Sequence, residues 1–470
     1  MANGAIGPGV IVDLSRMNSI GTVDLHNHCI NVGPGALRGE VNRAANESGF
    51  RFPVDPSSGE FCTIGGMVST NAAGAHTLRF GATRDWVIAL DCVFEDGSRA
   101  TVSRLAGIPR GIPALERFLA DVDPKMIESD ALLHPGVAKD SSGYAIAAYA
   151  HTRKLVDLLV GSEGTLVIIV GIQLGLAPMA HTTSSVLGAF SSLEAAVAGA
   201  VSAAAAGAVA CELLEKTFLD VASLAFIPAG TEAVLLAEVE GGYDQDAGTK
   251  AGKLARAFED SGATVTKVAL GASEQHEIWE LRHAASPILS RLDPSLKSMQ
   301  FIEDGAVPSR NLAAYVRGVR AALEKRGIRG VIFGHAGDAH IHVNPLVDVS
   351  RPEWRSNVEG LLDDVAGLTA QLGGTLSGEH GDGRLRTPLL SMVWSNHARE
   401  IFSMVKKAFD PSGILNPGVK VPLADQKPLG DIKYDPSLPP LPEEARAALD
   451  KITDERAYST LRLSLIPEKS

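Results

Sequence analysis

Two histidine-containing segments in the C-terminal half of the chain hold the residue types best suited to chemistry. Residues 334–345 read GHAGDAHIHVNP, and residues 377–383 read SGEHGDG. Imidazole and carboxylate groups together bind divalent ions such as zinc or manganese. A single histidine is more often structural, but several such groups in two glycine-rich segments favour a site. The two segments therefore predict a divalent-metal site.

The first segment predicts a hairpin that would gather its histidines on one face. Apolar, strand-like runs flank the polar turn between His335 and His340. The period of two along a strand puts His340, His342 and Asn344 on the same face. His335 lies opposite His340 in such a hairpin, so it shares that face. We expect Glu379, from the second segment, to complete the set of ligands.

The composition is that of an acidic globular protein. A length of 470 residues predicts about three domains. The hydrophobic content of 45% and the charged content of 21% are ordinary for a globular chain. The net charge of −12 argues against nucleic acid or an anionic membrane surface as the main partner.

The cysteines and the apolar runs favour a reduced, cytoplasmic protein. The 4 cysteines are widely spaced and form no CxxC pair, which argues against a self-contained iron–sulfur or zinc–cysteine module. The first residues have neither the basic region nor the apolar core of a signal peptide. The longest stretch without a charged residue, 164–193, is interrupted by glycine, proline and polar residues, so no transmembrane segment is predicted.

The order of predicted elements divides the chain into parts of different texture. Strands dominate up to about residue 176, with one helix predicted at 36–47 and a hairpin turn at Asp96-Gly97. The strands expected in this part are 10–14, 21–25, 29–32, 88–94, 99–103, 155–160 and 166–172. After that, helices at 192–206 and 247–261 alternate with strands at 209–214, 233–240 and 264–269. This alternation predicts an antiparallel sheet with helices on one side. From Val421 the chain is rich in proline, which predicts an extended tail with a short helix at 443–451.

A glycine-rich segment in the first part gives the second chemical signal. Residues 63–74 read TIGGMVSTNAAG, and residues 79–85 read RFGATRD. Small residues let the backbone approach a large flat or phosphorylated ligand, and exposed N–H groups bind phosphate or ring carbonyls. The alternative is a tight turn against a helix, which glycine alone would favour. The sequence has neither a GxGxxG motif in the context of a Rossmann unit nor a P-loop motif between a strand and a helix.

Six segments together resemble the FAD-linked oxidases of the vanillyl-alcohol-oxidase type, in the branch of D-lactate, glycolate and D-2-hydroxyglutarate dehydrogenases. They are 53–85, 139–144, 161–165, 334–345, 378–386 and 409–420. The resemblance runs from about Gly7 to Lys420. It implies an α+β fold with an FAD-binding domain at 1–176 and a cap domain at 177–395. The cap domain would contain an antiparallel sheet, helices and the metal site. A segment at 396–420 would return to the FAD domain, and a proline-rich tail would follow at 421–470.

The resemblance also implies roles for individual residues. Those expected to contact FAD are Pro53, Ile64, Gly65, Gly66, Ala72, Gly74, Gly81, Gly161, Glu163, Gly164, Thr165 and Asn416. The metal ligands would be His335, His342 and Glu379, and His380 would be the active-site base. Asn344 would contact the substrate, and Arg282 or Arg386 would bind its carboxylate as a bidentate clamp.

The chain departs from the family pattern at three points. The family's pyrophosphate loop lies just upstream of Gly7, so we expect the first part of the FAD domain to be missing and FAD binding to be poor. The usual Gly-Asn after Asp338 is Ala339-His340 here, so His340 either adds a ligand or faces solvent. Residues 382–386 resemble members with an iron–sulfur module downstream, and this chain stops without those cysteines.

The resulting hypothesis is flavin-dependent oxidation of a small anionic D-2-hydroxy acid to the 2-oxo acid. The flavin would take the hydride, the metal would bind the hydroxyl, and His380 would remove its proton. Electrons would pass to a quinone, a cytochrome or an iron–sulfur protein, and such a partner could associate the cytoplasmic protein with a membrane. The alternatives are a flavin-independent metallohydrolase and an inactive, truncated flavoprotein fragment. A visible absorption spectrum separates the first hypothesis from both.

Overall fold

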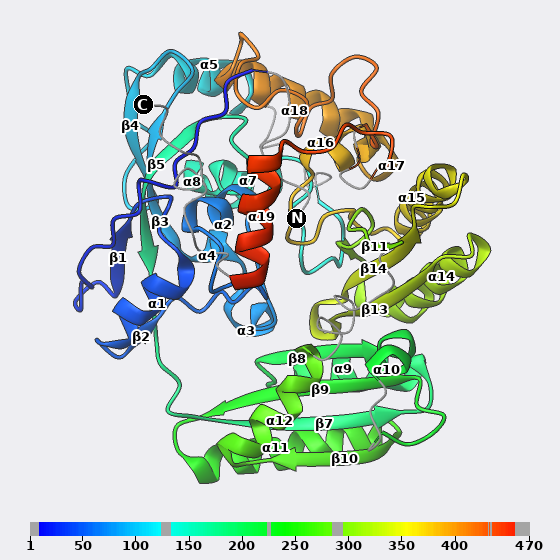
Figure 1. Cartoon of the computed structure of the whole chain (residues 1–470). Helices are drawn as coiled ribbons and strands as arrows, with labels where there is room; N and C mark the ends of the chain where they lie inside the picture. The colour runs from blue at the N-terminus through cyan, green and yellow to red at the C-terminus, as the bar shows by residue number, and fades with distance from the viewer. Residues whose placement is uncertain are drawn as a thin grey trace.

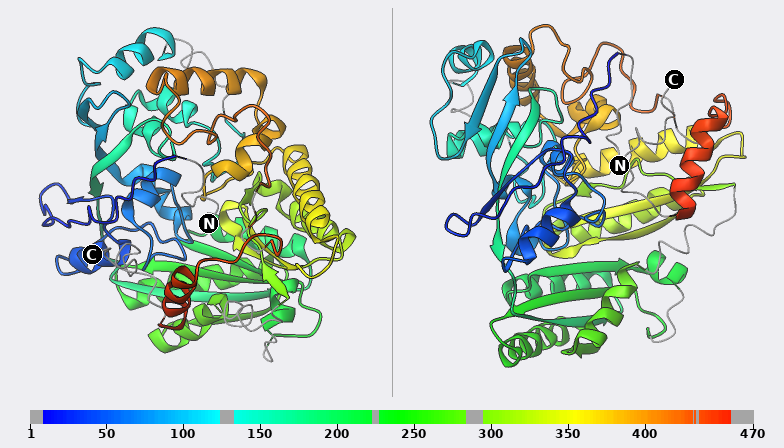
Figure 2. Two further views of the ribbon diagram at one scale, coloured as in Figure 1. Left: turned by 45° about the horizontal axis from the view of Figure 1, so that its top comes forward. Right: turned by 60° about the vertical axis from the view of Figure 1, so that its left-hand side comes forward.

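The computed structural model describes residues 9–123, 133–222, 227–283, 295–430, 432 and 435–455. These residues form two bodies, each built around an antiparallel sheet (Figures 1 and 2). The first body holds a 4-stranded sheet and the second an 8-stranded sheet. Within the described parts of the chain, no helix is both long enough and apolar enough to span a bilayer.

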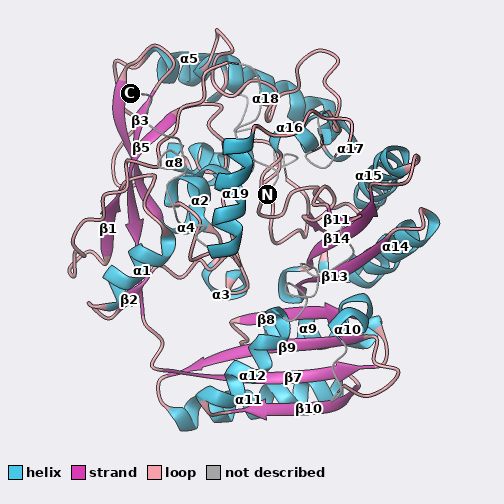
Figure 3. Cartoon of the chain, in the orientation of Figure 1, coloured by secondary structure: helices cyan, strands magenta, loops and turns pink. Residues whose placement is uncertain are grey.

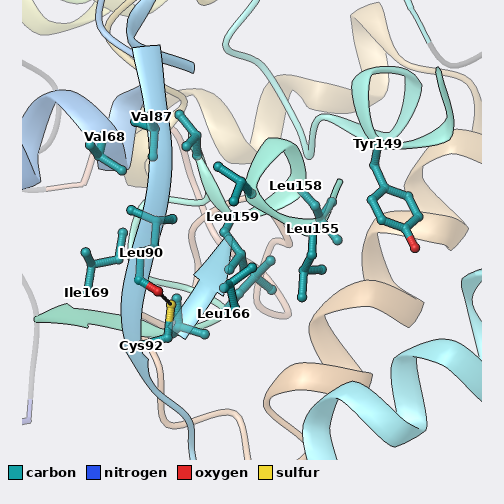
Figure 4. Packing of buried hydrophobic residues seen from close by; sticks show 14 of the residues in the cluster. Val68, Val87, Leu90, Cys92, Tyr149, Leu155, Leu158, Leu159, Leu166 and Ile169 are labelled. Carbon is teal, nitrogen blue, oxygen red and sulfur yellow. Dashed lines mark hydrogen bonds between the residues drawn. The ribbon is translucent and has the colours of Figure 1, made fainter. Parts of the chain in front are cut away.

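The first sheet has the order β1-β5-β3-β4. Its strands are β1 (Cys29–Val32), β3 (Val87–Val93), β4 (Arg99–Ser103) and β5 (Ile168–Gly175), and β2 (Phe50–Arg51) pairs separately with β6 (Ala177–Pro178). Its helices are α1 (Arg38–Asn46), α2 (Ile64–Thr70), α3 (Thr77–Phe80), α4 (Thr83–Trp86), α5 (Pro113–Asp121), α7 (Ile146–Thr152) and α8 (Leu155–Leu159). Apolar residues of β3, β5, α2 and α8 pack into one core (Figure 4).

A segment from far along the chain completes this first core. Helix α18 (Asn396–Phe409) packs beside α5, as Figure 1 shows. The Phe402 ring lies 5.8 Å from the Tyr144 ring, and the Phe409 ring lies 5.4 Å from the Phe118 ring. Arg117 Nε also donates to the carbonyl of Ala408 at 2.8 Å. Helix α18 is therefore part of the first body, although the second body precedes it in the sequence.

Two of the expected strands in the first body are absent. Residues 10–14 form no strand and are largely exposed, with Val10 at 92%. Residues 21–25 contribute only the isolated bridge between Asp24 and Cys29. Both runs are apolar or β-branched, but a strand forms only where a neighbour satisfies its backbone groups. No strand pairs with residues 10–14 among the described residues.

The strand expected at 155–160 is helix α8 instead. All of its residues are buried, and Asp157 binds the guanidinium of Arg104. Figure 4 shows Leu155, Leu158 and Leu159 in the core. Apart from Asp157, this short run is apolar and shows neither the period of a strand nor that of a helix, so periodicity could not decide between them.

The second sheet has the order β10-β7-β9-β8-β13-β14-β11, and β12 pairs with β14 (Figure 3). Its strands are β7 (Thr182–Phe190), β8 (Ala210–Glu215), β9 (Ala233–Gly241), β10 (Ala263–Ala269), β11 (Leu296–Ser298), β12 (Gly305–Ala306), β13 (Arg329–His335) and β14 (His340–Asp348). Its helices are α9 (Leu193–Ala205), α10 (Lys216–Ala222), α11 (Asp244–Asp260), α12 (Ala272–His283), α14 (Leu312–Lys325) and α15 (Trp354–Gln371).

Helices cover both faces of this sheet, which corrects the expectation of one covered face. Successive residues of β7 enter different cores: Val186 packs with α9 and α11, and Leu187 packs with α10 and α12. Leu235 and Leu236 of β9 divide in the same way. Neighbouring side chains of a strand point to opposite faces, so two successive apolar residues require burial on both.

Short elements and the tail complete the chain. They are the 3-10 turns η1 (Ser309–Asn311), η2 (Ala336–Asp338) and η3 (Thr387–Leu389), and the helices α16 (Gly383–Arg386), α17 (Leu390–Val393) and α19 (Glu443–Glu455). Helix α19 agrees with the short helix expected in the proline-rich tail.

A half-buried histidine links the two bodies. His76, which precedes α3, lies 2.5 Å from Asp55 through Nδ1 and 2.9 Å from Glu238 of β9 through Nε2. Burial alone would lower the pKa of His76, but the two carboxylates outweigh burial and raise it to about 11. Nearby, Glu240 of β9 binds Arg51. The imidazolium therefore acts as a charged clamp between the bodies.

We expect the variant His76→Gln to lower the free energy of unfolding by about 1.5–3 kcal/mol near pH 6, the range for hydrogen bonds to charged groups. The folded pKa lies above that of the unfolded chain, so the stabilisation is full below about pH 6.5 and is lost as the pH rises toward 11. Urea unfolding at several pH values measures the difference. The variant His181→Gln, at an exposed position, is the control. An equal deficit at pH 6 and pH 10 would contradict the charged clamp.

Candidate functional site

The predicted histidine hairpin is present. Strands β13 and β14 pair in a register that sets His335 opposite His340 and Phe333 opposite His342. The turn between them is η2, and Ala339 ends it with a φ of 51°. The three imidazoles are buried and lie on the same face, with ring centroids between 4.6 and 5.4 Å apart.

His335 and His342 each have one ring nitrogen held by an acceptor and the other turned to Glu379. Nδ1 of His335 bonds Glu212 of β8, and Nδ1 of His342 lies 2.9 Å from the backbone carbonyl of Glu303. The Nε2 atoms of His335 and His342 lie 3.5 and 3.3 Å from Oε1 of Glu379. A metal-binding histidine has this arrangement, because the acceptor fixes the tautomer and leaves a lone pair toward the ion.

His340 is fully buried, which excludes the solvent-facing alternative. Its Nε2 lies 2.9 Å from Oδ1 of Asp304. Its Nδ1 lies 4.0 Å from Oε2 of Glu379 and has no hydrogen-bond partner among the described residues. Burial lowers the pKa of His340 to about 3, so the ring is neutral.

Glu379 is held both at its backbone N–H group and at its side-chain carboxylate. Its backbone N–H donates to Asp304 at 3.2 Å, and Lys139 Nζ lies 3.3 Å from its Oε2. Burial alone would raise the pKa of Glu379, but Lys139 and His335 outweigh burial and lower it well below its usual range. The carboxylate is therefore ionised and turns Oε1 toward the imidazoles.

His380 follows Glu379, and its side chain lies at the border of the histidine cluster. Its side chain is 29% exposed, its ring stacks on His342 at 5.6 Å, and its Nδ1 lies 3.4 Å from Oε1 of Glu303. Burial alone would lower the pKa of His380, but Asp304 and Glu303 raise it to about 9. His380 thus borders the cluster and holds a proton at neutral pH when no cation is near.

The donor set fits a divalent ion. His335, His340, His342 and Glu379 offer ligand atoms that all lie within 4.8 Å of one another. Three imidazoles and one carboxylate suit zinc and also suit manganese. The acceptors on the far ring nitrogens and the unpaired Nδ1 of His340 indicate a site prepared to receive a cation.

The segments that the resemblance assigns to FAD also converge. Thr63 caps α2, and the loop 161–165 lies along that helix because Gly161 N donates to Val68 O and Glu163 N to Ser69 O, both at 2.9 Å. The returning segment joins them through Asn416 Nδ2, which donates to the Glu163 carbonyl at 2.7 Å. The Glu163 carboxylate accepts N–H groups of residues 382 and 383.

The glycines beside α2 leave backbone open to a flat ligand. A Cβ at Gly164, where φ is +68°, would meet no described atom within 4 Å, and one at Gly66 would meet only Oγ1 of Thr63, at 3.0 Å. Gly65 and Gly74 differ, because a Cβ there would strike Pro34 or Asp55. Open space at the first two positions fits FAD, and close packing explains the other two.

The other expected FAD residues lie in the same region of the first body. Those that are buried are Pro53, Ile64, Gly161, Glu163 and Thr165, and those that are partly exposed are Ala72, Gly81 and Asn416. Gly81 and Gly161 have φ angles of +69° and +87°.

Lys139 joins the two chemical regions. Its Nζ donates to the carbonyl of Gly74 at 2.8 Å, in the glycine-rich segment, and lies 3.3 Å from Glu379 and 3.5 Å from Asp338, in the metal-capable cluster. The side chain is 1% exposed. Both regions therefore belong to one site.

The two expected carboxylate-binding arginines occupy different surroundings. Arg282 of α12 is partly buried, donates from Nε to Glu212 at 2.7 Å and lies over the Phe333 ring at 4.6 Å. Arg386 is 2% exposed and binds Glu303 at 2.6 Å. Asn344 is partly buried on the histidine face of β14.

Several residues that build the site had been given no role. They are Lys139, Glu212, Glu303 and Asp304. Glu212 had a detectable signal, since it is an acidic residue inside the fully buried strand β8. Lys139 begins the segment 139–144, one of the six that carry the family resemblance. Glu303 and Asp304 stand beside a glycine in a segment without any pattern.

Comparisons with known proteins agree with this geometry. The family model for the FAD linked oxidases, C-terminal domain, matches residues 180–419, and that for the FAD binding domain matches residues 1–103. The glycolate oxidase subunit GlcD of Bacillus subtilis is 30% identical over 418 residues, which are 87% of this chain and 79% of that protein.

Two further relatives have related names. D-lactate dehydrogenase of Anaerostipes hadrus is 27% identical, over 88% of this chain and 80% of its own. D-2-hydroxyglutarate dehydrogenase of Pseudomonas putida is 27% identical over 96% of this chain, which spans only 46% of that protein.

A solved structure shares the fold. The 4-ethylphenol oxidase from Gulosibacter chungangensis superposes with a TM-score of 0.62 at 14% identity, covering 86% of this chain and 79% of that one. The fold is thus α+β with an FAD-binding domain of the vanillyl-alcohol-oxidase type. On the matched models, the B. subtilis relative and the convergent glycine-rich segments, the chain belongs to the FAD-linked oxidases and is an FAD-dependent oxidoreductase.

Proposed function

We propose that this chain oxidises a D-2-hydroxy acid of the D-lactate, glycolate or D-2-hydroxyglutarate class to the 2-oxo acid. The observation that carries this proposal is the Lys139 bridge, because it sets a metal-capable cluster directly against the glycine-rich segment. Oxidation of a 2-hydroxy acid needs both: an acceptor for the hydride of the α-carbon, and groups that bind and deprotonate the hydroxyl. The names of the relatives support the class of substrate.

The proposed domains follow the same logic. Residues 1–176 and 396–420 would bind FAD, residues 177–395 would cover it and carry the metal ligands, and residues 421–470 would form a tail. When bound, FAD supplies the acceptor for the hydride. A divalent ion on His335, His342 and Glu379 would supply a Lewis acid that lowers the pKa of the substrate hydroxyl.

His380 is the proposed base for the hydroxyl proton. Its position beside Glu379 and its partial exposure allow contact with a substrate at the cluster. A pKa of about 9 keeps the imidazole protonated at neutral pH. A cation held by the neighbouring His342 and Glu379 would lower that pKa, because like charges disfavour one another. The base and the metal site are therefore expected to act together.

Arg282 is the better candidate for binding the substrate carboxylate. Arg386 is enclosed with Glu303, and breaking such a buried pair costs about 3–5 kcal/mol. Arg282 lies at the border of the cluster, and Asn344 shares the face of the histidines. We propose that these two orient the substrate. The electrons would leave to a quinone, a cytochrome or an iron–sulfur protein.

Anaerobic mixing of the FAD-loaded protein with a panel of D- and L-2-hydroxy acids tests the proposal. Either the achiral glycolate or a chiral D-2-hydroxy acid should bleach the flavin absorption with one equivalent of 2-oxo acid formed, and the L-enantiomer of a chiral substrate should not. A fully FAD-loaded protein that no member of the panel reduces would refute the proposed substrate class.

Removing a metal ligand should abolish metal binding but leave the cofactor bound. We expect His335→Ala and Glu379→Ala to lose the divalent ion and the activity, since each supplies an atom of the same cluster. FAD content should stay at the wild-type level, because the glycine-rich segment is unchanged. Metal analysis and flavin absorption on the same samples give both results. Full metal occupancy in His335→Ala would exclude that ligand.

The variant His380→Asn should keep FAD and metal but lower turnover by about 10²–10⁴-fold, the usual range for loss of a general base. The limb of the pH–rate profile that reports the base should vanish. In the metal-free wild type, NMR should find a His380 pKa near 9 that falls on metal addition. Turnover within a few-fold of wild type, with the limb intact, would assign the base elsewhere.

Filling the open backbone beside α2 should impair FAD binding. We expect Gly66→Leu to weaken it by at least about tenfold, equal to about 1.4 kcal/mol. The new side chain would enter the space left for the cofactor, where it meets only the cap oxygen of Thr63. Flavin fluorescence titration gives the affinity. The control is Gly367→Leu in α15, where a Cβ also meets open space. Equal affinity of Gly66→Leu and the control would move FAD away from α2.

A further inference from the structure

We propose that Nδ1 of His340 is a fourth protein ligand of the divalent ion and that the resulting set of three imidazoles and one carboxylate selects zinc over manganese. This inference rests on the metal site of the proposed function and extends it. The resemblance implied only His335, His342 and Glu379 as ligands, and His340 is a further histidine on the same face of the hairpin.

The first support is the orientation of the ring. Asp304 accepts Nε2–H of His340 at 2.9 Å, as Glu212 and the Glu303 carbonyl do for the other two imidazoles. This acceptor fixes the tautomer in which Nδ1 carries a lone pair. Each of the three histidines of the hairpin therefore has an acceptor on one ring nitrogen and turns its other nitrogen toward Glu379.

The second support is the state of that nitrogen. His340 is 0% exposed, and its Nδ1 has no hydrogen-bond partner among the residues that the structure describes. An unpaired buried nitrogen costs about 1–3 kcal/mol. It faces Oε2 of Glu379 at 4.0 Å, a separation that leaves both atoms able to approach a shared cation. A bound ion would remove the cost.

The third support is the space around the ring. Gly378 packs against it so closely that a Cβ there would lie 2.6 Å from Nε2 of His340. The backbone N–H of Gly378 also donates to the carbonyl of Asp304 at 2.8 Å. The segment carrying Glu379 and the histidine ring are thus fitted to each other, and the ring has no room to turn away.

The added imidazole changes which ion binds best. Imidazole nitrogen favours zinc, whereas carboxylate, carbonyl and water oxygens suit manganese and magnesium. Four protein ligands also satisfy a tetrahedral zinc ion, which can expand to a fifth position for a substrate oxygen. A site with two imidazoles would discriminate less between these metals.

Metal titrations of the chelator-treated, full-length protein test this inference. The variant His340→Asn keeps a donor for Asp304 but lacks the Nδ1 ligand. It should lose at least about 100-fold in zinc affinity, measured by competition with a chromophoric chelator, and less than about tenfold in manganese affinity. The matched control is His397→Asn, which removes an exposed histidine of α18.

A zinc affinity of His340→Asn within threefold of wild type, together with an unchanged visible spectrum of the cobalt-substituted protein, would overturn the inference but leave the metal site intact. A wild-type protein that binds no divalent ion would overturn the metal site itself. If the variant fails to fold, X-ray absorption of the zinc-loaded wild type decides, because three coordinated imidazoles support the inference and two refute it.

Discussion

The buried carboxylate of Asp304 is the interaction on which the site depends. It accepts hydrogen bonds from Nε2 of His340, Oγ of Ser377 and the backbone N–H groups of Glu379 and His380, with donor–acceptor distances of 2.9 to 3.2 Å. A carboxylate at 0% exposure is costly unless such partners compensate it. The requirement to satisfy this one group brings the hairpin of β13 and β14 against the segment that carries the metal ligand and the proposed base.

A second buried network holds the same segment from its other end. Lys420 Nζ lies 2.9 Å from Glu163, 3.0 Å from Asp382 and 2.7 Å from the carbonyl of Ser141, and it is 1% exposed. Lys420 belongs to the returning segment and Glu163 to the loop beside α2. Asp382 belongs to the segment after His380, and Ser141 to the segment of Lys139. The ammonium neutralises two carboxylates that would otherwise repel each other. Both bodies of the protein are therefore joined at the site by charge pairs rather than by apolar contacts alone.

The balance of charge explains how the site can accept a cation. Glu212, Glu379, Asp304, Asp338 and Glu303 surround the imidazoles, and the permanent cations among them are fewer. In the metal-free state the excess is met by protons, since the pKa values of His335 and His380 are both raised to about 9. A divalent ion would replace those protons, because a ligating imidazole must be neutral. The same carboxylates that orient the rings thus make the site attractive to a metal.

Local patterns in the sequence predicted much of the fold. The hairpin turn at Asp96-Gly97 and strand β4 agree with prediction, as do α9, β8 and β9. Errors arose where a local pattern lacks a unique solution. Residues 155–159 are apolar except for Asp157 and form a helix, and residues 10–14 are mostly apolar but lack a partner strand. The second sheet is covered on both faces because successive apolar residues of β7 and β9 point to opposite faces, and both faces must then be buried.

The sequence by itself determined the histidine face, because a hairpin turn and the period of a strand are local properties of residues 331–344. It also determined the family, because six motifs stand in order along the chain. Only the tertiary structure decided what lies behind and between those residues. Glu212, Asp304 and Lys139 reach the cluster from distant segments, and no spacing rule connects positions so far apart. The orientation of His340 belongs to the same class, since a single buried acceptor chooses which of its two nitrogens faces the site.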